Sequence, residues 1–231
     1  MDVLIDSLLA GAARATGNVA VIDVFRAFTT AAVALANGVC QILMVSTIEE
    51  ALALRGSGAA QLCMGEVRGR KPVGFDFGNS PSELLGTALQ GATIAQRTSA
   101  GTQGIIAAAG GADRLYAASL VTASATARAL RAGAPDRVTI VAMGDNGTIR
   151  TNEDELCALH LRNLLEGRPG DPEAIRRLIL AGGEVERFRD PARPHVPLGD
   201  LDIALEIDRY AFAIRVELQA GRPVARMEQS V

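Results

Sequence analysis

A carboxylate, an arginine and two threonines occur together in the segment 23–30, DVFRAFTT, directly after an apolar run. Because burying an unpaired ion is costly, Asp23 needs a partner, which would be a bound cation, Arg26 or the start of a helix. Thr29 and Thr30 would add hydroxyls and backbone N–H groups to a first helical turn, an arrangement that suits an oxyanion. A structural ion pair between Asp23 and Arg26, with the threonines as helix caps, would explain the same residues without a ligand.

Two clusters of similar composition follow, each after another apolar run. The segment 65–69, GEVRG, carries an acid and a base two residues apart, Glu66 and Arg68. The segment 96–104, QRTSAGTQG, joins one arginine to glycines and hydroxyls that could surround phosphate or sulfonate oxygens, although a turn without a ligand is the simpler explanation. The candidate residues of this segment are Arg97, Thr98, Ser99, Gly101 and Thr102.

The segment 74–83, GFDFGNSPSE, adds a further carboxylate in a stretch without helical periodicity. Asn79 and Ser80 precede a proline, as they would in an anion-holding turn before a helix. Ser80 as an N-cap paired with Glu83 would explain part of this pattern, but it leaves Asp76 and Asn79 without a role.

Taken together, these clusters favour phosphoryl-transfer chemistry. Carboxylates without histidine or cysteine companions prefer a hard divalent cation, so we expect Mg²⁺ as the cofactor. Arginines and glycine-rich turns favour a doubly charged anionic substrate, a small phosphate ester. His160 and His195 have no evident triad partner or metal-ligand neighbour, and the three cysteines lie in or beside apolar runs.

The elements that position these residues alternate between apolar β-type runs and alanine-rich helical stretches, which is typical of an α/β protein with a largely parallel, or mixed, central sheet. In such a sheet ligands bind at the carboxyl ends of the strands, where the clusters fall. Strands are predicted at 18–25, 40–46, 60–65, 92–97, 113–118, 137–143 and 212–217. Helices are predicted at 27–36, 47–50 onward, 82–89, 104–109, 123–131, 153–166 and 172–180, and the segments 66–81 and 187–200 as irregular connections.

Length and composition limit the class of protein. The 231 residues, 48% of them hydrophobic, fit a single domain over 1–231, in which any subdomain boundary would fall near 145–152. The net charge of -3 disfavours nucleic acid as a partner. The sequence shows no signal peptide and no span for a membrane, and its three cysteines form no CxxC pair, so we expect a cytoplasmic protein with reduced thiols.

Four segments are distinctive as strings and occur in one order: VIDVFRAFTTAAVALANG (21–38), GEVRGRKPVGFDFGNSPSE (65–83), QRTSAGTQG (96–104) and NEDELCA (152–158). They resemble the Mg²⁺-dependent 2-phosphosulfolactate phosphatases, the ComB-type proteins. The resemblance implies a three-layer α/β/α fold, assembly as a homo-oligomer such as a dimer, and hydrolysis of (2R)-O-phospho-3-sulfolactate to sulfolactate and phosphate in coenzyme M biosynthesis.

The resemblance and the clusters together give a set of expected roles. Asp23, Arg26, Arg68 and Arg97 are expected to be catalytic, and Asp23 is either a covalent nucleophile or a metal ligand. The expected metal ligands are Asp23, Glu66, Asp76, Glu153 and Asp154. The expected substrate-binding residues are Thr29, Thr30, Asn79, Ser80, Thr98, Ser99, Gly101 and Thr102. Phe28 and Ala100 stand where the family often has threonine and asparagine, which leaves open a different small phosphorylated acid as substrate, or binding of an anionic metabolite without turnover.

Overall fold

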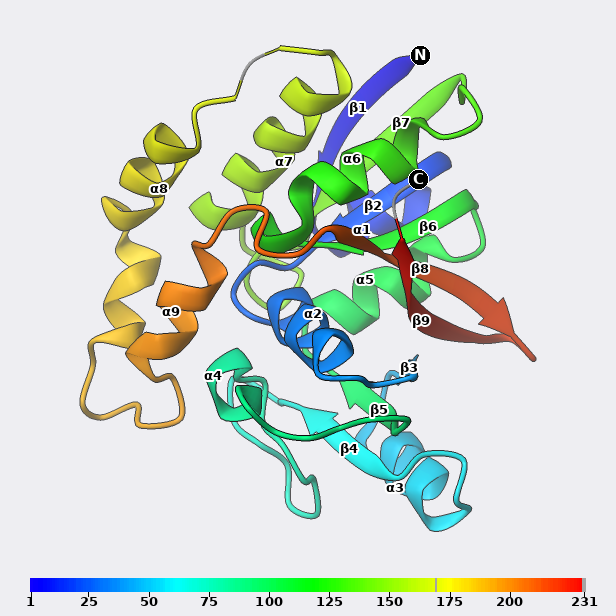
Figure 1. The fold of residues 1–231 in the computed structure, drawn as a ribbon, viewed down its shortest axis with the longest axis vertical. Helices are drawn as coiled ribbons and strands as arrows, with labels where there is room; N and C mark the ends of the chain where they lie inside the picture. Colours follow the sequence, from blue (N-terminus) through cyan, green and yellow to red (C-terminus); the bar gives the residue numbers. More distant parts are fainter. Residues whose placement is uncertain (169, 230–231) are drawn as a thin grey trace.

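The computed structural model describes residues 1–168 and 170–229, and within them nine strands form one sheet (Figure 1). The first block consists of parallel strands in the order β1 (Asp2–Ser7), β7 (Arg137–Ala142), β2 (Gly17–Ile22) and β6 (Ala112–Ala118). The second parallel block consists of β3 (Gln41–Met44), β5 (Thr93–Arg97) and β4 (Leu62–Gly65). Between them lies the antiparallel hairpin of β8 (Phe212–Gln219) and β9 (Arg222–Gln229). The sheet is therefore mixed but mostly parallel, as the sequence predicts.

Helices cover both faces of this sheet and give the expected three layers. They are α1 (Leu8–Arg14), α2 (Ala27–Ala36), α3 (Ile48–Gly56), α4 (Pro81–Leu84), α5 (Gly101–Ala108), α6 (Ala123–Arg131), α7 (Asn152–Leu165), α8 (Pro172–Leu180) and α9 (Leu198–Ala204), with 3-10 turns at Leu120–Thr122 and Gly183–Phe188. Strand β2 shows the layering: Val19 and Val21 pack in one core with α1 and α5, whereas Ala20 and Ile22 pack in another with α6 and α7. A strand buried on both faces needs the continuous apolar run seen in its sequence.

Helix α2 is the central element of the fold. Every residue from Ala27 to Leu35 is buried, and the helix lies between the two parallel blocks in Figure 1. It shares its core with Ile42 and Ile94 of the second block and with Leu84 of α4. Because α2 follows β2 directly, this packing brings the carboxyl end of β2 close to the second block.

The predicted helices at 27–36, 123–131 and 172–180 are confirmed, and the helix that begins after Thr47 has the expected capping box with Glu50. The predicted helix at 82–89 is wrong in length, because α4 ends at Leu84. Strands β1 and β9 and helix α1 are not predicted. The hairpin turn at Ala220 and Gly221 has both φ angles positive, and alanine is a weak signal for such a turn.

The predicted span 1–231 includes residues 169 and 230–231, which lie outside the described residues. Among the described helices, none combines the length and the apolar character that crossing a membrane would require.

Candidate active site

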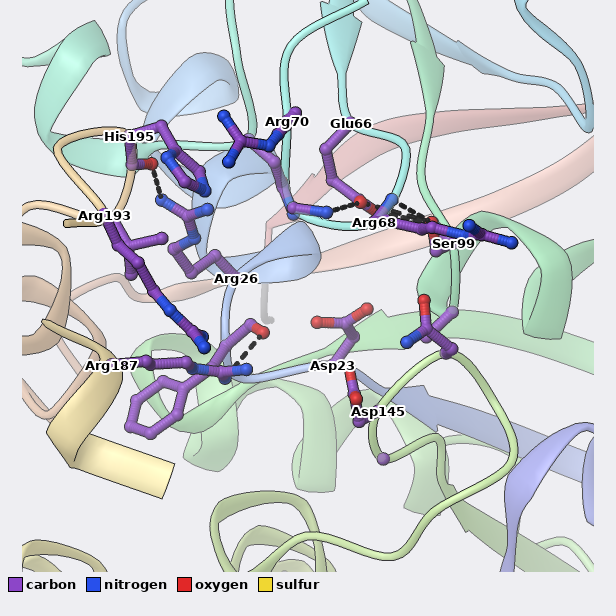
Figure 2. A pocket seen from close by; sticks show the side chains of 17 residues that line it. Asp23, Arg26, Glu66, Arg68, Arg70, Ser99, Asp145, Arg187, Arg193 and His195 are labelled. Atoms are coloured by element: carbon purple, nitrogen blue, oxygen red, sulfur yellow. Dashed lines mark hydrogen bonds between the residues drawn. The ribbon is translucent and has the colours of Figure 1, made fainter. Parts of the chain in front are cut away.

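A cavity of about 460 Å³ opens where strands β2, β4, β5 and β7 end (Figure 2). Asp23 and Arg26 follow β2, Glu66 to Arg70 follow β4, and Ser99 and Ala100 follow β5. The remaining walls come from the loop 144–146 after β7 and from the segment 187–196. The volume is within the range of about 300–1,000 Å³ usual for small-molecule sites.

Asp23 lies between the first turns of two helices. The backbone N–H of Ala27 in α2 donates to its Oδ1 at 3.0 Å, and the N–H of Gly101 in α5 donates to its Oδ2 at 2.9 Å. Helix N-termini favour negative charge, so both helices stabilise the carboxylate where it lines the cavity.

Burial nevertheless raises the pKa of Asp23, the negative charge of Glu66 also raises it, and the net result is a pKa of about 6 in place of the ordinary 3.8. The hydrogen bonds from Ala27 and Gly101 and the charge of Arg187 lower this pKa without cancelling the effect of burial. When the pKa of a carboxyl stays raised although two helix N-termini face it, its ionised form has too little positive charge around it. This environment suits a bound cation.

Glu66 is placed by a close approach of strands β4 and β5. The φ of Gly65 is +139°, and a Cβ there would lie 1.9 Å from the carbonyl oxygen of Arg97, so only glycine fits. The carboxylate of Glu66 accepts hydrogen bonds from the backbone N–H groups of Ser99 and Gly69. These donors hold the buried side chain at the cavity wall.

Arg26 is buried and paired with Asp200 of α9. Its Nη1 lies 2.5 Å from Oδ2 of Asp200, which has no exposed surface, and the same nitrogen donates to the carbonyl oxygen of His195 at 3.0 Å. The other oxygen of Asp200 accepts from Oγ of Ser80 and from the backbone N–H of Ser82. Asp200 thus joins the chain after β2 to the start of α4, and Arg26 joins it to the segment before α9.

Arg187 reaches the cavity from the 3-10 turn Gly183–Phe188. Its Nη2 lies 3.5 Å from Oε1 of Glu153 and donates to the carbonyl oxygen of Phe25 at 3.3 Å. Its guanidinium lies over the ring of Phe25, 5.6 Å from the centroid. Figure 2 shows the guanidinium directed toward Asp23, whose pKa it lowers.

Arg68, Arg70 and Arg193 are exposed at the cavity mouth. Arg193 pairs with Asp190 at 3.3 Å, whereas neither Arg68 nor Arg70 forms an ion pair with any described residue. The guanidiniums of Arg68 and Arg70 are therefore available to an anion in the cavity.

Two buried acids lie behind the cavity and outside its lining. Oδ1 of Asp154 accepts from the N–H of Val24 and its Oδ2 from the N–H of Gly144, both at 2.8 Å, so this residue ties the end of β2 to the loop after β7. Burial raises the pKa of Asp154 well above its ordinary value, and burial raises that of Glu153 to about 7. Neither lines the cavity, although both were expected to be metal ligands.

Two other expected residues also lie outside the cavity lining. Oδ2 of Asp76 accepts from the N–H of Cys63 at 2.7 Å and pairs with Arg55 at 3.0 Å. Arg97 donates to the carbonyl oxygens of Glu66 at 2.8 Å and Ser46 at 3.2 Å. Asp76 fixes the loop after β4 and Arg97 supports the backbone of Glu66.

The expected hydroxyl groups divide in the same way. Thr29 and Thr30 donate to backbone carbonyls of the preceding turn, Thr98 and Thr102 bond to each other, and Ser80 bonds to Asp200. Ser99 and Asn79 line the cavity, and Gly101 reaches Asp23 through its N–H. Oδ1 of Asn79 is buried and has no hydrogen-bond partner among the described residues, so it could accept one from a ligand.

Five charged or titratable residues of the cavity were not expected: Arg70, Asp145, Arg187, Arg193 and His195. Arg70 lies in the long loop 66–81, and the length of this loop is the only feature of the sequence that indicates a functional role for it. The segment 187–200 has neither a helical nor a strand period, so nothing in the sequence indicated where its arginines and histidine would lie.

The residues present are compatible with Mg²⁺. Within residues 1–168 and 170–229, no three His, Cys, Asp or Glu side chains are arranged to hold a metal by themselves. Mg²⁺ is commonly bound by one or two carboxylates together with water and substrate phosphate oxygens. Asp23 and Glu66 both line the cavity, and the charge of Glu66 raises the pKa of Asp23, so this pair fits such a site.

Comparisons with known proteins identify the family of this chain. A family model described as 2-phosphosulpholactate phosphatase matches residues 5–181. Relatives named probable 2-phosphosulfolactate phosphatase include one from Thermus thermophilus, 38% identical over 90% of this chain and 87% of the relative, and one from Thermotoga petrophila, 35% identical over 76% and 74%. A third, from Deinococcus radiodurans, is 40% identical over 56% of this chain and about half of the relative, 54%. The chain therefore belongs, as a phosphoric monoester hydrolase, to the 2-phosphosulfolactate phosphatase family.

Proposed function

We propose that this protein hydrolyses 2-phosphosulfolactate to sulfolactate and inorganic phosphate in a Mg²⁺-dependent reaction. One observation carries the proposal: a buried carboxylate, Asp23, is held between two helix N-termini in a cavity surrounded by arginines. Cations and oriented N–H groups are what a site needs in order to stabilise a phosphoryl group whose charge develops during transfer.

Asp23 and Glu66 would hold the Mg²⁺, which supplies neutralisation of the phosphoryl oxygens when bound. Arg187 lies close enough to influence Asp23, and it would bind a phosphoryl oxygen together with Arg68. The hydroxyl of Ser99 donates to Glu66 at 3.1 Å and would hold that carboxylate toward the metal. These residues orient the ester so that its phosphorus faces Asp23.

Two routes for the bond change remain candidates. In one, an oxygen of Asp23 attacks phosphorus, the bond from phosphorus to the ester oxygen breaks, the ester oxygen takes a proton from solvent, and water then hydrolyses the aspartyl phosphate. In the other, water attacks phosphorus directly, the same bond breaks and the ester oxygen takes the proton that the water loses, while Asp23 would only hold the metal. Acid quenching followed by peptide mapping distinguishes them, because only the first route leaves phosphate on Asp23.

The test of the proposed function is phosphate release from 2-phosphosulfolactate, 2-phospholactate and 2-phosphoglycerate, with Mg²⁺ and with EDTA. We expect Mg²⁺-dependent release, with the highest kcat/KM for 2-phosphosulfolactate. A higher kcat/KM for another phosphorylated acid would replace the substrate. No release from any of the three would overturn the proposal in favour of a protein that binds an anionic metabolite.

We extend the proposal to a homodimer that acts in the cytoplasm. The described cysteines are all free, which supports a reducing compartment. Leu4, Leu9 and Ile149 are exposed on the edge strand β1 and its neighbours, which supports a second copy at this edge. Light scattering on the purified protein would show twice the mass of the 24.1 kDa chain, and a monomer would refute this part.

A further inference from the structure

The cavity is divided into two parts of different charge. Figure 2 shows Arg26, Arg70, Arg193 and His195 grouped on one side, with Asp23 and Asp145 on the other. We call the group of Arg26, Arg70, Arg193 and His195 the basic wall. Its members come from three separate stretches of chain, so the fold brings them together rather than local sequence.

Three guanidiniums of the basic wall carry charges that act on the imidazole of His195. Burial lowers the pKa of His195, and the positive charges of Arg70, Arg26 and Arg193 lower it further, which shows that all three act on this ring. The carbonyl oxygen of His195 also accepts the hydrogen bond from Arg26. Like charges collected in a cavity repel one another, so this grouping is unfavourable until an anion occupies it.

The nearby carboxylates do not balance this charge completely. One oxygen of Asp200 forms the ion pair with Arg26, and its other oxygen accepts hydrogen bonds from Ser80 and Ser82. Asp190 pairs with Arg193 at a site open to water, where such pairs are weak. Arg70 has no ion pair with any residue in the described part of the chain, so it contributes an uncompensated charge.

We infer that the basic wall binds the sulfonate of the substrate and makes the enzyme selective for it. This inference rests on the proposed function, in which phosphate and carboxylate share one carbon of the substrate and the sulfonate is carried by the next. If the phosphorus lies at Asp23, the sulfonate is the anionic group that extends farthest from it. The guanidiniums of Arg70, which forms no ion pair with a described residue, and of Arg193 would bind its oxygens.

Part of the basic wall lies outside the part of the chain that the family model matches. Arg193 and His195 lie beyond residue 181, where the match to the family model ends, whereas Asp23 and Glu66 lie within it. The segment that follows α8 therefore supplies half of the basic wall. Its role in selectivity is separable from the chemistry at Asp23.

The first test compares two substrates that differ only in the sulfonate, 2-phosphosulfolactate and 2-phospholactate. A charged hydrogen bond lost from this wall should lower kcat/KM by about tenfold or more. We expect Arg193→Gln and Arg70→Gln each to reduce the preference for 2-phosphosulfolactate by about that factor. Arg189→Gln, an exposed arginine outside the cavity and on the same segment, should keep the preference. Equal losses on both substrates would overturn the inference.

The second test measures binding without turnover, by calorimetry in Mg²⁺ buffer with sulfolactate, lactate and inorganic phosphate as ligands. The wild type should bind sulfolactate more tightly than lactate, and Arg193→Gln should remove that difference while binding of phosphate changes less. A wild type without preference for sulfolactate refutes the basic wall as a sulfonate site. A sulfonate preference in a protein that releases no phosphate would refute the proposed function and leave the wall standing.

Discussion

The backbone N–H of Gly101 donates a hydrogen bond of 2.9 Å to Oδ2 of Asp23, across 78 residues of sequence. A Cβ at position 101 would lie 2.9 Å from that oxygen and 3.0 Å from atoms of both Ala27 and Phe28. The glycine is thus needed for close approach, because α5 must begin in contact with the residue that directly follows β2. The contact joins the two parallel blocks of the sheet at the cavity.

Replacement of Gly101 by alanine should therefore impair activity more than folding. The added methyl group must push the start of α5 away from Asp23, and a misplacement of about 1 Å in an active site can cost about 100-fold in rate. We expect kcat/KM for 2-phosphosulfolactate to fall by about that factor. Gly110→Ala is the matched control, since a Cβ there meets nothing within 4 Å. Equal activity of the two variants would contradict the role of this contact.

Asp200→Asn should destabilise the protein strongly. The substitution leaves the buried guanidinium of Arg26 without its charged partner, and breaking a buried pair in this way costs about 3–5 kcal/mol. Urea unfolding at neutral pH measures the change in the free energy of unfolding. The exposed Asp202 of the same helix provides the control variant Asp202→Asn. A loss below about 1 kcal/mol for Asp200→Asn would show that Arg26 is satisfied by other groups.

Glu153→Gln should change how stability depends on pH. Burial raises the pKa of Glu153 from 4.5 to about 7, so between these values the folded protein keeps a proton that the unfolded chain loses. The stability that this proton provides is present below pH 4.5 and is lost as the pH rises through 7. Relative to wild type, the free energy of unfolding of the variant should rise by up to about 3 kcal/mol between pH 5 and pH 8.

Unfolding curves at both pH values test this expectation. The charge of Glu153 also raises the pKa of Asp154, so its removal changes the difference between variant and wild type in the same direction. A difference between variant and wild type that stays constant, or falls with rising pH, would show that Glu153 is ionised in the folded protein at low pH.

Glu66→Gln should weaken the binding of Mg²⁺ more than it affects folding. The carboxylate lines the cavity beside Asp23, and its loss would remove one of two proposed ligands. We expect the Mg²⁺ concentration for half-maximal activity to rise by about tenfold or more. Glu49→Gln, on the exposed face of α3, serves as control. An unchanged Mg²⁺ requirement for Glu66→Gln would exclude Glu66 as a ligand.

The sequence could indicate Asp23 and Glu66 because each follows a strand whose apolar run is unmistakable, and parallel strands deliver such residues to one edge. It could not separate residues that line the cavity from residues that support it. Asp76 and Arg97 belong to the same kinds of clusters, but their side chains bond to the backbone of neighbouring segments and to Arg55. Which way a polar side chain turns depends on contacts that spacing alone does not contain.

The segment 187–196 shows the other limit of sequence analysis. Arg187, Arg193 and His195 lie in a stretch without periodicity, and tertiary bonds to Phe25 and Arg26 bring it to the cavity. Strands β1 and β9 escaped prediction for a related reason, because charged residues interrupt their apolar pattern. Their place is fixed by pairing with β7 and β8.

The most direct test of the central claim, that Asp23 is the centre of the chemistry, compares Asp23→Asn with Asp76→Asn. Both replace a carboxylate of the predicted metal set, but only Asp23 lines the cavity. With 2-phosphosulfolactate and Mg²⁺, kcat/KM should fall about 1,000-fold or more for Asp23→Asn and stay within about threefold of wild type for Asp76→Asn. Full activity of Asp23→Asn would contradict the claim, whichever route the reaction takes.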